Sequence, residues 1–268
     1  MSATPLRLAS WNVNSIRVRL DAVLAWLQQS ETDILCLQET KVADEAFPSD
    51  AFHSLGYEVA SFGQKGYNGV AIVARAPLRD PTRGFGDETL DAEGARLLGV
   101  TVRGLHVYSA YIPNGKVVGS PAYALKLQWL ARLRALLDHR HDPAARYAVC
   151  GDFNVAAEER DVHDPLFWRA QVLFHPAARE ALRQLCEPNL VDTFRLHHQE
   201  AGQYSWWDYR QGALAKNEGL RIDYVFASRP LAARCTDAGI DREPRRAANP
   251  SDHTPVHATF ALDEEESS

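Results

Sequence analysis

The chain has 268 residues, of which 46% are hydrophobic, and a formal net charge of −6. This length and apolar content suffice for one large domain, so we expect residues 1–268 to form a single domain with a frayed acidic tail at 261–268. The negative charge argues against a general polyanion binder, although carboxylates clustered around a cation would contribute much of it.

Short apolar runs predict nine strands, and helical periodicity predicts three helices among them. The expected strands are residues 6–11, 33–38, 57–62, 68–75, 96–102, 105–112, 146–151, 221–228 and 255–260. The expected helices are residues 16–29, 121–138 and 176–186, the last opened by Pro176. Many strands follow one another through short turns with Gly or Pro, which favours antiparallel pairing. We therefore predict a four-layered α/β sandwich of two packed, mainly antiparallel β-sheets flanked by helices.

Neither a targeting segment nor a membrane-spanning segment is apparent. The N-terminus MSATPLRLAS has no apolar core, and no run approaches ~18 apolar residues. The four cysteines are widely spaced, and Cys36 and Cys150 lie in apolar runs. Disulfide scaffolds are denser in cysteine, so we expect reduced thiols in a cytoplasmic protein. The ratio of 24 Arg to five Lys hints at a bacterial source.

Polar side chains recur where the predicted strands end. Asn12 follows the first strand, and Glu39 follows the second. Asp152 and Asn154 follow the strand 146–151 and are two residues apart, so both side chains project to one side. These positions are candidates for one shared site.

Two further polar residues belong with this set. Asp223 lies inside an apolar strand, and a buried ionised carboxylate costs several kcal/mol unless it is paired. His253, which follows Asp252 directly near the end of the chain, would serve as the partner of Asp223. Five separate strand-end sites of oxygen donors and histidine make a hard-cation site with an attached general base plausible.

Each residue alone also has an ordinary structural explanation. These are a helix cap at Asn12, a solvated loop position at Glu39, an Asx turn at Asp152 and Asn154, a turn cap at Asp252 and a structural role for His253. Zinc would require clustered His and Cys at fixed spacing, which the ten histidines do not show. Carboxylate and amide oxygens suit Mg²⁺ or Mn²⁺, ions that usually accompany phosphate substrates.

Several motifs resemble those of the exonuclease III family of abasic-site (AP) endonucleases, within the endonuclease/exonuclease/phosphatase superfamily. They are LQETK (37–41), GQKGYNGVAIV (63–73), YIPNG (111–115), GDFNV (151–155), VDTFR (191–195), SWWDYR (205–210), GLRIDY (219–224) and PSDH (250–253). GDFN with SDH alone would indicate only the superfamily. SWWDYR with GLRIDY narrows the resemblance to the DNA-repair branch, and the family fold agrees with the predicted sandwich.

The resemblance implies roles for the strand-end residues. The expected metal site is made of Glu39, as the main ligand, with Asn12 and Asp252. The expected catalytic group is Asp152 as the base that activates water, Asn154 aligning it, His253 on the scissile phosphate, Asp223 as its partner, and Tyr111 as a phenolic donor. The expected DNA-backbone contacts are Lys41, Lys65, Arg96, Asn114 and Lys116, each of which is otherwise an ordinary solvated side chain.

An apolar pocket for the base-less sugar is also implied, lined by Trp206, Leu220 and Ile222. Trp206 is alternatively a plain core aromatic. Animal members of the family carry an aromatic residue where this chain has Leu220, which would alter the balance between abasic cleavage and 3′-end trimming. The segment 160–174 matches the family only loosely, so no role is carried over to it.

We therefore expect a Mg²⁺-dependent DNA-repair nuclease that hydrolyses the phosphodiester 5′ to abasic sites, with 3′–5′ exonuclease and 3′-end-trimming activity. Its expected partner is double-stranded DNA with abasic sites or damaged 3′ ends, and its expected state is a monomer away from membranes. One alternative is a superfamily phosphoesterase acting on phosphoinositides or other small phosphate esters, against which the SWWDYR and GLRIDY motifs argue. A non-catalytic DNA-binding module would require loss of Glu39, Asp152, Asp223 or His253, and all four are present.

Overall fold

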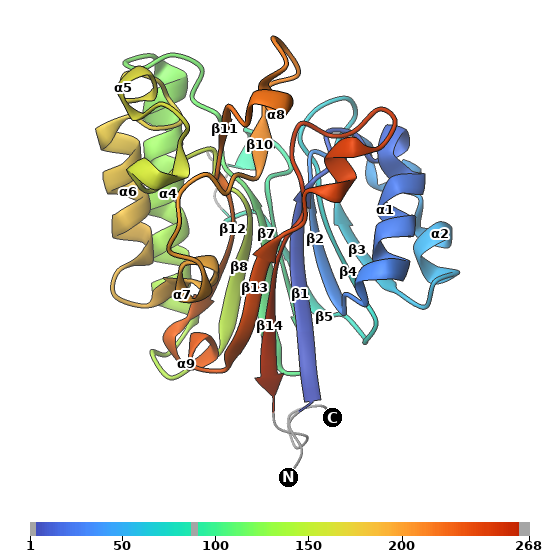
Figure 1. Cartoon of the computed structure of the whole chain (residues 1–268). Helices are drawn as coiled ribbons and strands as arrows, with labels where there is room; N and C mark the ends of the chain where they lie inside the picture. Colours follow the sequence, from blue (N-terminus) through green and yellow to red (C-terminus); the bar gives the residue numbers. More distant parts are fainter. Residues whose placement is uncertain (1–3, 87–90, 263–268) are drawn as a thin grey trace.

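Two six-stranded β-sheets pack face to face, and helices cover both outer surfaces (Figure 1). The computed structural model describes residues 4–86 and 91–262. One helical layer contains α1 (Ile16–Ser30) and α2 (Ser49–His53), and the other contains α4 (Pro121–Arg140) and α6 (Pro176–Cys186). The predicted four-layered α/β sandwich is confirmed.

The first sheet has the strand order β13-β14-β1-β2-β4-β3. Its strands are β13 (Cys235–Ile240), β14 (Val256–Leu262), β1 (Thr4–Asn12), β2 (Ile34–Gln38), β4 (Val70–Ala74) and β3 (Glu58–Phe62). Every neighbouring pair is antiparallel except β1 and β2, which are parallel and are joined through α1. Because of that crossover, β1 and β2 end at the same edge of the sheet.

The second sheet repeats this plan with the order β5-β6-β7-β8-β12-β9. Its strands are β5 (Arg79–Arg83), β6 (Leu97–Val102), β7 (Leu105–Tyr111), β8 (Tyr147–Asp152), β12 (Asp223–Ser228) and β9 (Leu190–Asp192). The single parallel pair is β7 and β8, joined through α4. Each sheet therefore contributes two strand ends to one edge of the sandwich.

Local sequence explains why these elements form. Every residue of β2, β4, β8 and β12 is buried, as expected for apolar strands that are covered on both faces. Helix α4 starts with Pro121, and the hydroxyl of Ser120 accepts a hydrogen bond from the Tyr123 backbone at 3.2 Å. A Cβ on Gly151 would lie 1.8 Å from the Ala110 carbonyl oxygen, so only glycine allows β7 and β8 to pair there.

The remaining elements are short. They are α5 (Pro165–Trp168), α7 (Thr193–His197), α8 (Ala213–Lys216), α9 (Arg229–Ala232), β10 (Trp206–Trp207), β11 (Gly219–Leu220) and the 3₁₀ turns η1 (Asp44–Ala46), η2 (Glu159–Asp161) and η3 (Glu243–Arg246). The β10–β11 hairpin and α8 stand at the end of the molecule opposite the start of β1 and the end of β14 (Figure 1). This end is also where β1, β2, β7 and β8 finish.

All nine predicted strands and all three predicted helices are present. The predicted frayed tail is partly wrong, because residues 261 and 262 pair with Pro5 and Thr4 in the sheet, while residues 263–268 lie outside the described part. All four cysteines are free thiols, and Cys36 and Cys150 are buried as expected. No helix in residues 4–86 or 91–262 has the length and apolar character needed to cross a membrane.

Candidate active site

The topology brings the predicted strand-end residues to one edge of the sandwich. In the first sheet, Asn12 is level with Gln38, directly before Glu39. In the second sheet, Asp152 lies opposite both Tyr111 on β7 and Asp223 on β12. Residues separated by more than 200 positions in the chain therefore surround one point.

Two carboxylates and an imidazole form the centre of the site. Glu39, Asp152 and His253 each offer one ligand atom, and these atoms lie within 4.8 Å of one another. The Asn12 side-chain amide donates to Glu39 Oε1 at 2.9 Å and to Asp152 Oδ2 at 2.9 Å. One fully buried amide thus fixes the spacing of the two carboxylates.

A third carboxylate, that of Asp223, holds the His253 ring through the nitrogen that faces away from Asp152. Its Nδ1 lies 2.9 Å from Asp223 Oδ2, and its Nε2 lies 3.7 Å from Asp152 Oδ2. Ser205 Oγ donates to Asp223 Oδ2 at 2.6 Å and accepts from the backbone N–H groups of Ile222 and Asp223. The Asp223–His253 pair that the sequence predicted is therefore formed, with its Nε2 face turned toward Asp152.

The charges in this buried cluster shift both members of the Asp152–His253 pair. Burial raises the pKa of Asp152 to about 7; the positive charge of His253 opposes this shift, and the negative charges of Asp223 and Glu39 add to it. Burial disfavours the charged form of His253, but the carboxylates of Asp223 and Asp152 outweigh it and raise its pKa to about 10. The site thus combines an imidazolium with a carboxyl group that titrates near neutrality.

A hydrogen-bond chain fixes the orientation of Asp152. The backbone N–H of Asn154 donates to Asp152 Oδ1 at 2.8 Å, and the Asn154 side chain donates to Oδ2 at 3.3 Å. Asn114 in turn donates to Asn154 Oδ1 at 3.0 Å. Asn154 adopts a left-handed backbone conformation with φ 51°, which costs of order 1 kcal/mol and is typical of functional loops.

The other side of the cluster contains Glu39, Lys41 and Asn14. Lys41 Nζ lies 2.8 Å from Glu39 Oε2 and also donates to Asn14 Oδ1. Burial favours the neutral form of Glu39, but hydrogen bonds from Asn12 and Lys41 lower its pKa below the ordinary value. Glu39 also has a left-handed backbone, with φ 51°. Lys41, predicted as a DNA contact, is therefore an ion-pair partner of the predicted metal ligand.

Asp252 is attached to the cluster through intermediaries and lies outside the group of three close ligands. Asn14 Nδ2 donates to its Oδ1 at 2.9 Å, and Trp206 Nε1 donates to its Oδ2 at 3.0 Å. Burial acts against ionisation, but the charge of His253 and these two hydrogen bonds lower the pKa of Asp252. Both of its oxygen atoms are thus engaged with neutral donors.

Tyr111 and Arg96 form one wall of the site. The Arg96 guanidinium lies 4.7 Å from the centre of the Tyr111 ring. Burial, together with the negative charges of Glu39 and Asp152, raises the pKa of Tyr111 well above its ordinary value. The phenol is therefore a permanent donor directed toward the two carboxylates.

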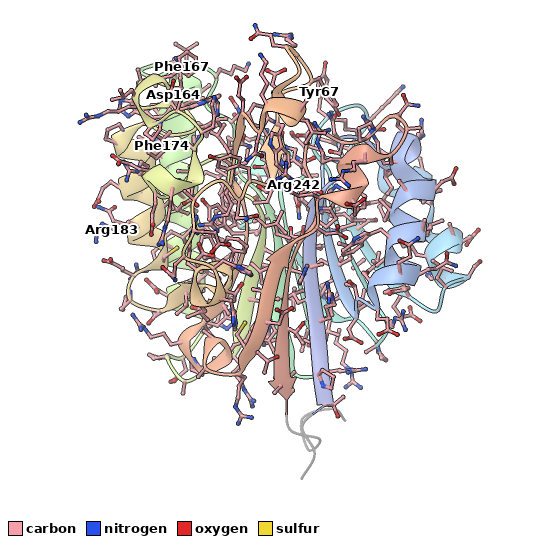
Figure 2. The ribbon with its side chains drawn as sticks, viewed as in Figure 1. Tyr67, Asp164, Phe167, Phe174, Arg183 and Arg242 are labelled. Carbon is pink, nitrogen blue, oxygen red and sulfur yellow. The ribbon has the colours of Figure 1, made fainter. Side chains whose placement is uncertain are left out.

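The remaining predicted DNA contacts are more peripheral. Lys65, Asn114 and Lys116 are exposed side chains, and only Asn114 makes a side-chain bond to the cluster. Tyr67 and Phe167 are also exposed, at 74% and 57%, and lie at the same end of the molecule on opposite sides of the β10–β11 hairpin (Figure 2). This end therefore combines cationic and aromatic side chains around the acidic centre.

The predicted sugar-pocket residues pack together in one apolar cluster. Leu220 and Ile222 are almost fully buried, with exposures of 0% and 1%, and Trp206 packs against them from a half-buried position. The segment 156–174 closes over them through Trp168, whose ring makes an edge contact with Trp206 at 6.2 Å, and through Phe174. Trp206 is thus the member of the three that lies closest to solvent.

Three residues that build this site had no role in the sequence-based prediction. Asn14 links Asp252 to Lys41, Ser205 holds Asp223, and Lys126 is buried beneath Asn114 and Asn154. The sequence holds a signal for two of these residues. Ser205 opens the SWWDYR motif, and Lys126 lies three residues after Tyr123 on the apolar face of the predicted helix 121–138.

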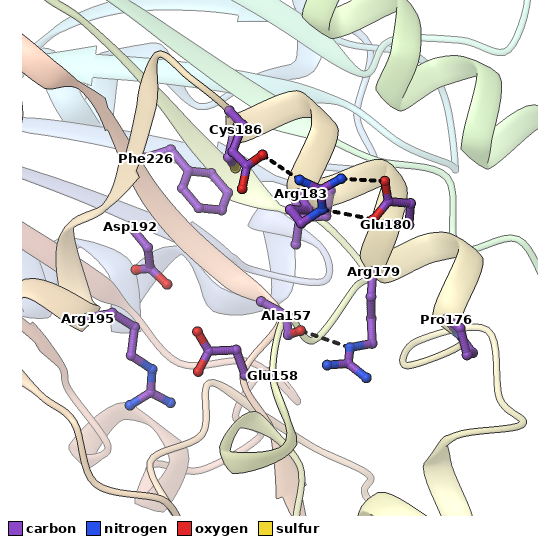
Figure 3. Close-up of a pocket in the computed structure, with 12 residues that line it drawn as sticks. Ala157, Glu158, Pro176, Arg179, Glu180, Arg183, Cys186, Asp192, Arg195 and Phe226 are labelled. Atoms are coloured by element: carbon purple, nitrogen blue, oxygen red, sulfur yellow. Dashed lines mark hydrogen bonds and ion pairs between the residues drawn. The ribbon is translucent and has the colours of Figure 1, made fainter.

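A cavity of about 580 Å³ lies away from this cluster, between α6 and α7 (Figure 3). Its lining includes Arg179, Arg183, Glu180 and Glu187. Arg183 is paired with both Glu180 and Glu187, and Arg179 donates to the Ala157 carbonyl oxygen. The charges of this cavity are therefore largely used within the protein.

The donor set of the acidic cluster fits a hard divalent cation. Four carboxylates, Glu39, Asp152, Asp223 and Asp252, gather in this cluster; Lys41 pairs with Glu39, and His253 pairs with Asp223 and lies near Asp152. Burial is the main reason for the high pKa of Asp152; the negative charges of Asp223 and Glu39 add to it, and a bound cation would relieve their repulsion. Carboxylate oxygens with an amide suit Mg²⁺ or Mn²⁺ better than zinc.

Known proteins resemble this chain in sequence and in fold over nearly its whole length. The sequence profile of the Endonuclease/Exonuclease/phosphatase family matches residues 9–253. Exodeoxyribonuclease III of Haemophilus influenzae is 33% identical over 266 residues, covering 95% of this chain and 100% of that protein. A structure of an AP endonuclease from Archaeoglobus fulgidus superposes with a TM-score of 0.93 and 42% identity, over 96% of this chain and 100% of that one. The structure of the Neisseria 3′ phosphatase NExo, bound to a product DNA hairpin, superposes with a TM-score of 0.91 and 36% identity, over 95% of this chain and 99% of that one.

Proposed function

The chain belongs to the endonuclease/exonuclease/phosphatase family, and from that premise we propose that it is a DNA-repair nuclease. Its reaction is hydrolysis of the phosphodiester 5′ to an abasic site, with 3′–5′ exonuclease and 3′-end-trimming activity on double-stranded DNA. The observation that carries the proposal is the convergence of Glu39, Asp152 and the Asp223–His253 pair within one small cluster. We also propose that residues 1–268 act as one catalytic domain.

Phosphodiester hydrolysis needs a deprotonated nucleophile and donors for the charge that develops on the phosphate oxygens. Asp152, with a pKa of about 7, is matched to accept a proton from water near neutral pH. Asn154 orients the carboxylate through two hydrogen bonds. The His253 imidazolium, held by Asp223, stabilises the developing negative charge, and Tyr111 adds a neutral donor.

Glu39, with Asn12 and Asp252, would hold Mg²⁺, or Mn²⁺ in its place. When bound, the ion supplies Lewis-acid polarisation of a phosphate oxygen. Lys41 neutralises Glu39 in the structure, so a cation on Glu39 would free the lysine to reach a DNA phosphate. The single lysine thus serves both the resting charge balance and substrate binding.

Side chains around this centre hold the DNA by its sugar-phosphate backbone, which positions the duplex without reading its sequence. The proposed contacts are Lys41, Lys65, Arg96, Asn114 and Lys116. We assign the apolar wall against the extruded sugar to half-buried Trp206, with Leu220 and Ile222 packed behind it. A phosphoesterase for small esters would need no such wall, and the SWWDYR and GLRIDY motifs that carry these residues support a DNA substrate. We extend the proposal to a monomer in the bacterial cytoplasm.

The test uses a duplex with one tetrahydrofuran abasic analogue. Purified protein should nick the duplex 5′ to the analogue in Mg²⁺, stop in EDTA, and leave an intact duplex of the same sequence uncut at that position. Inositol phosphates and phosphorylated sugars serve as alternative substrates under the same conditions. Hydrolysis of those esters without nicking of the DNA would overturn the proposed function, as would undiminished nicking in EDTA.

A further inference from the structure

Lys126 is a charged residue in the interior of the protein. It belongs to α4, is 0% exposed and is among the largest fully buried side chains. Burial lowers the pKa of its ammonium group to about 7, and the nearby Asp152 carboxylate acts in the opposite direction. An unpartnered buried charge costs several kcal/mol, so the surroundings must stabilise this group specifically.

The ammonium group uses all three of its N–H donors on backbone carbonyl oxygens. Nζ donates to Asn114 O at 3.0 Å, to Asn154 O at 2.6 Å and to Val172 O at 2.9 Å. A side chain that only filled space would need no charge and no donors here. The geometry is that of a three-way clamp on the main chain.

Each of the three carbonyl oxygens lies in a different loop. Asn114 follows β7, Asn154 follows β8, and Val172 lies in the segment after α5. Asn114 and Asn154 are joined to each other and to Asp152 by side-chain hydrogen bonds. Val172 packs against the apolar cluster that contains Leu220 and Ile222. One ammonium group therefore connects three segments: the loop of Asn114, which we propose contacts DNA, the loop of Asn154 beside the proposed base, and the segment of Val172, which packs against the proposed sugar pocket.

The space around the lysine stem is closely filled. A Cβ on Gly115 would lie 3.0 Å from Lys126 Cδ and 3.2 Å from the Tyr123 ring. Gly115 also has a positive φ of 91°, so this loop can pass over the stem only with glycine at that position. The backbone beside Asn114 is thus shaped around Lys126.

We propose that Lys126 is a positioning residue whose buried ammonium group holds these three loops in one mutual geometry. It acts through Asn114 and Asn154 and does not touch the substrate. The inference rests on the proposed nuclease function for its catalytic consequence, but its structural consequence is independent of any activity. Loss of the clamp should release the three loops together while α4 and both sheets stay folded.

The test compares Lys126→Met with Leu133→Ala, a core truncation in the same helix that removes no hydrogen bond to the three loops. Both should lower stability, since one leaves carbonyl groups unpaired and the other leaves a cavity. Hydrogen exchange should accelerate in residues 113–116, 154–157 and 170–174 only in Lys126→Met. Its single-turnover rate on the abasic duplex should fall roughly 10- to 100-fold, with the Kd for that DNA changed less than about threefold. Leu133→Ala should keep the wild-type rate.

The outcomes separate this inference from the proposed function. If wild-type protein does not cut the abasic duplex but Lys126→Met still loosens the three loops, the nuclease proposal fails and the clamp stands. If exchange and rate in Lys126→Met match those of Leu133→Ala, the clamp is overturned. Should Lys126→Met not fold, Lys126→Gln, which keeps two donors, takes its place. Failure of both to fold while Leu133→Ala folds would also overturn the positioning role, because the lysine would then be a general requirement of the fold.

Discussion

At the residue scale, the site depends on a few neutral hydrogen-bond donors that lie between several buried carboxylates. Asn12 donates to both Glu39 and Asp152, and without that amide the two negative groups would face each other directly. Burial, with smaller additions from the charges of Asp223 and Glu39, raises the pKa of Asp152 to about 7. His253 carries the compensating positive charge. The chemistry we assign to Asp152 and His253 follows from these shifts.

The role of Asp152 as the base is tested by Asp152→Asn. The amide keeps the size of the side chain but cannot accept the proton, so the single-turnover rate on abasic DNA should fall about 10²- to 10⁴-fold while DNA binding persists. Asp50→Asn, in an exposed position on α2, is the control and should cut like wild type. A wild-type rate in Asp152→Asn would remove this residue from the proton transfer.

The Asp223–His253 pair should make stability depend on pH. The pKa of His253 rises from 6.5 to about 10 on folding, so its contribution is complete below pH 6.5 and disappears as the pH rises through 10. Asp223→Asn removes the largest attractive charge, and breaking such a buried pair costs roughly 3–5 kcal/mol. Urea unfolding should show that deficit at pH 6 and a smaller one at pH 10. A deficit independent of pH would contradict the account.

At the element scale, the segment between β8 and α6 is pinned to the sandwich by buried charges. Asp161 is fully buried and pairs with Arg221, at 2.7 Å, and with Arg195. Arg221 is itself 1% exposed and makes a second ion pair with Asp192 at 2.7 Å. These contacts hold the start of the segment, and Lys126 holds its later part. The segment that departs from the family pattern is therefore firmly attached at two points.

Removal of the central carboxylate measures this attachment. Asp161→Asn leaves Arg221 and Arg195 with too little negative charge in a dry environment, and should lower the free energy of unfolding by roughly 3–5 kcal/mol. The control is Glu243→Gln, which breaks the Glu243–Arg246 pair, whose side chains are each 73% exposed, and should change stability by less than about 1 kcal/mol. Urea denaturation measures both. Equal small losses would show that the buried network contributes no more than a surface pair.

At the scale of the whole molecule, the apolar pattern predicted the interior of the fold but not its borders. In the two six-stranded sheets the missed strands are β5, β9 and β13, three of the four edge strands; the short β10–β11 hairpin was also not predicted. Residues of β5 are mostly exposed and include a proline, so the strand has no apolar alternation to detect. Pairing with a neighbour, and not local sequence, makes such segments strands.

The site was predictable to a similar extent. Strand-end polar residues and the family resemblance named Glu39, Asp152 and His253, whose ligand atoms the structure brings within 4.8 Å of one another. Ser205 and Lys126 escaped because their role is to hold other groups, through contacts between segments distant in the chain. Spacing along a sequence does not encode such contacts. The structure was needed to find them.

Divalent-ion binding tests the central claim most directly, namely that these distant side chains form one cation site. Mn²⁺ binding, followed by water-proton relaxation, is measured for wild type, Glu39→Gln and the exposed control Glu45→Gln. We predict one site in wild type and in Glu45→Gln, and affinity lowered about 10- to 100-fold in Glu39→Gln. Wild-type Mn²⁺ affinity in Glu39→Gln would contradict the account.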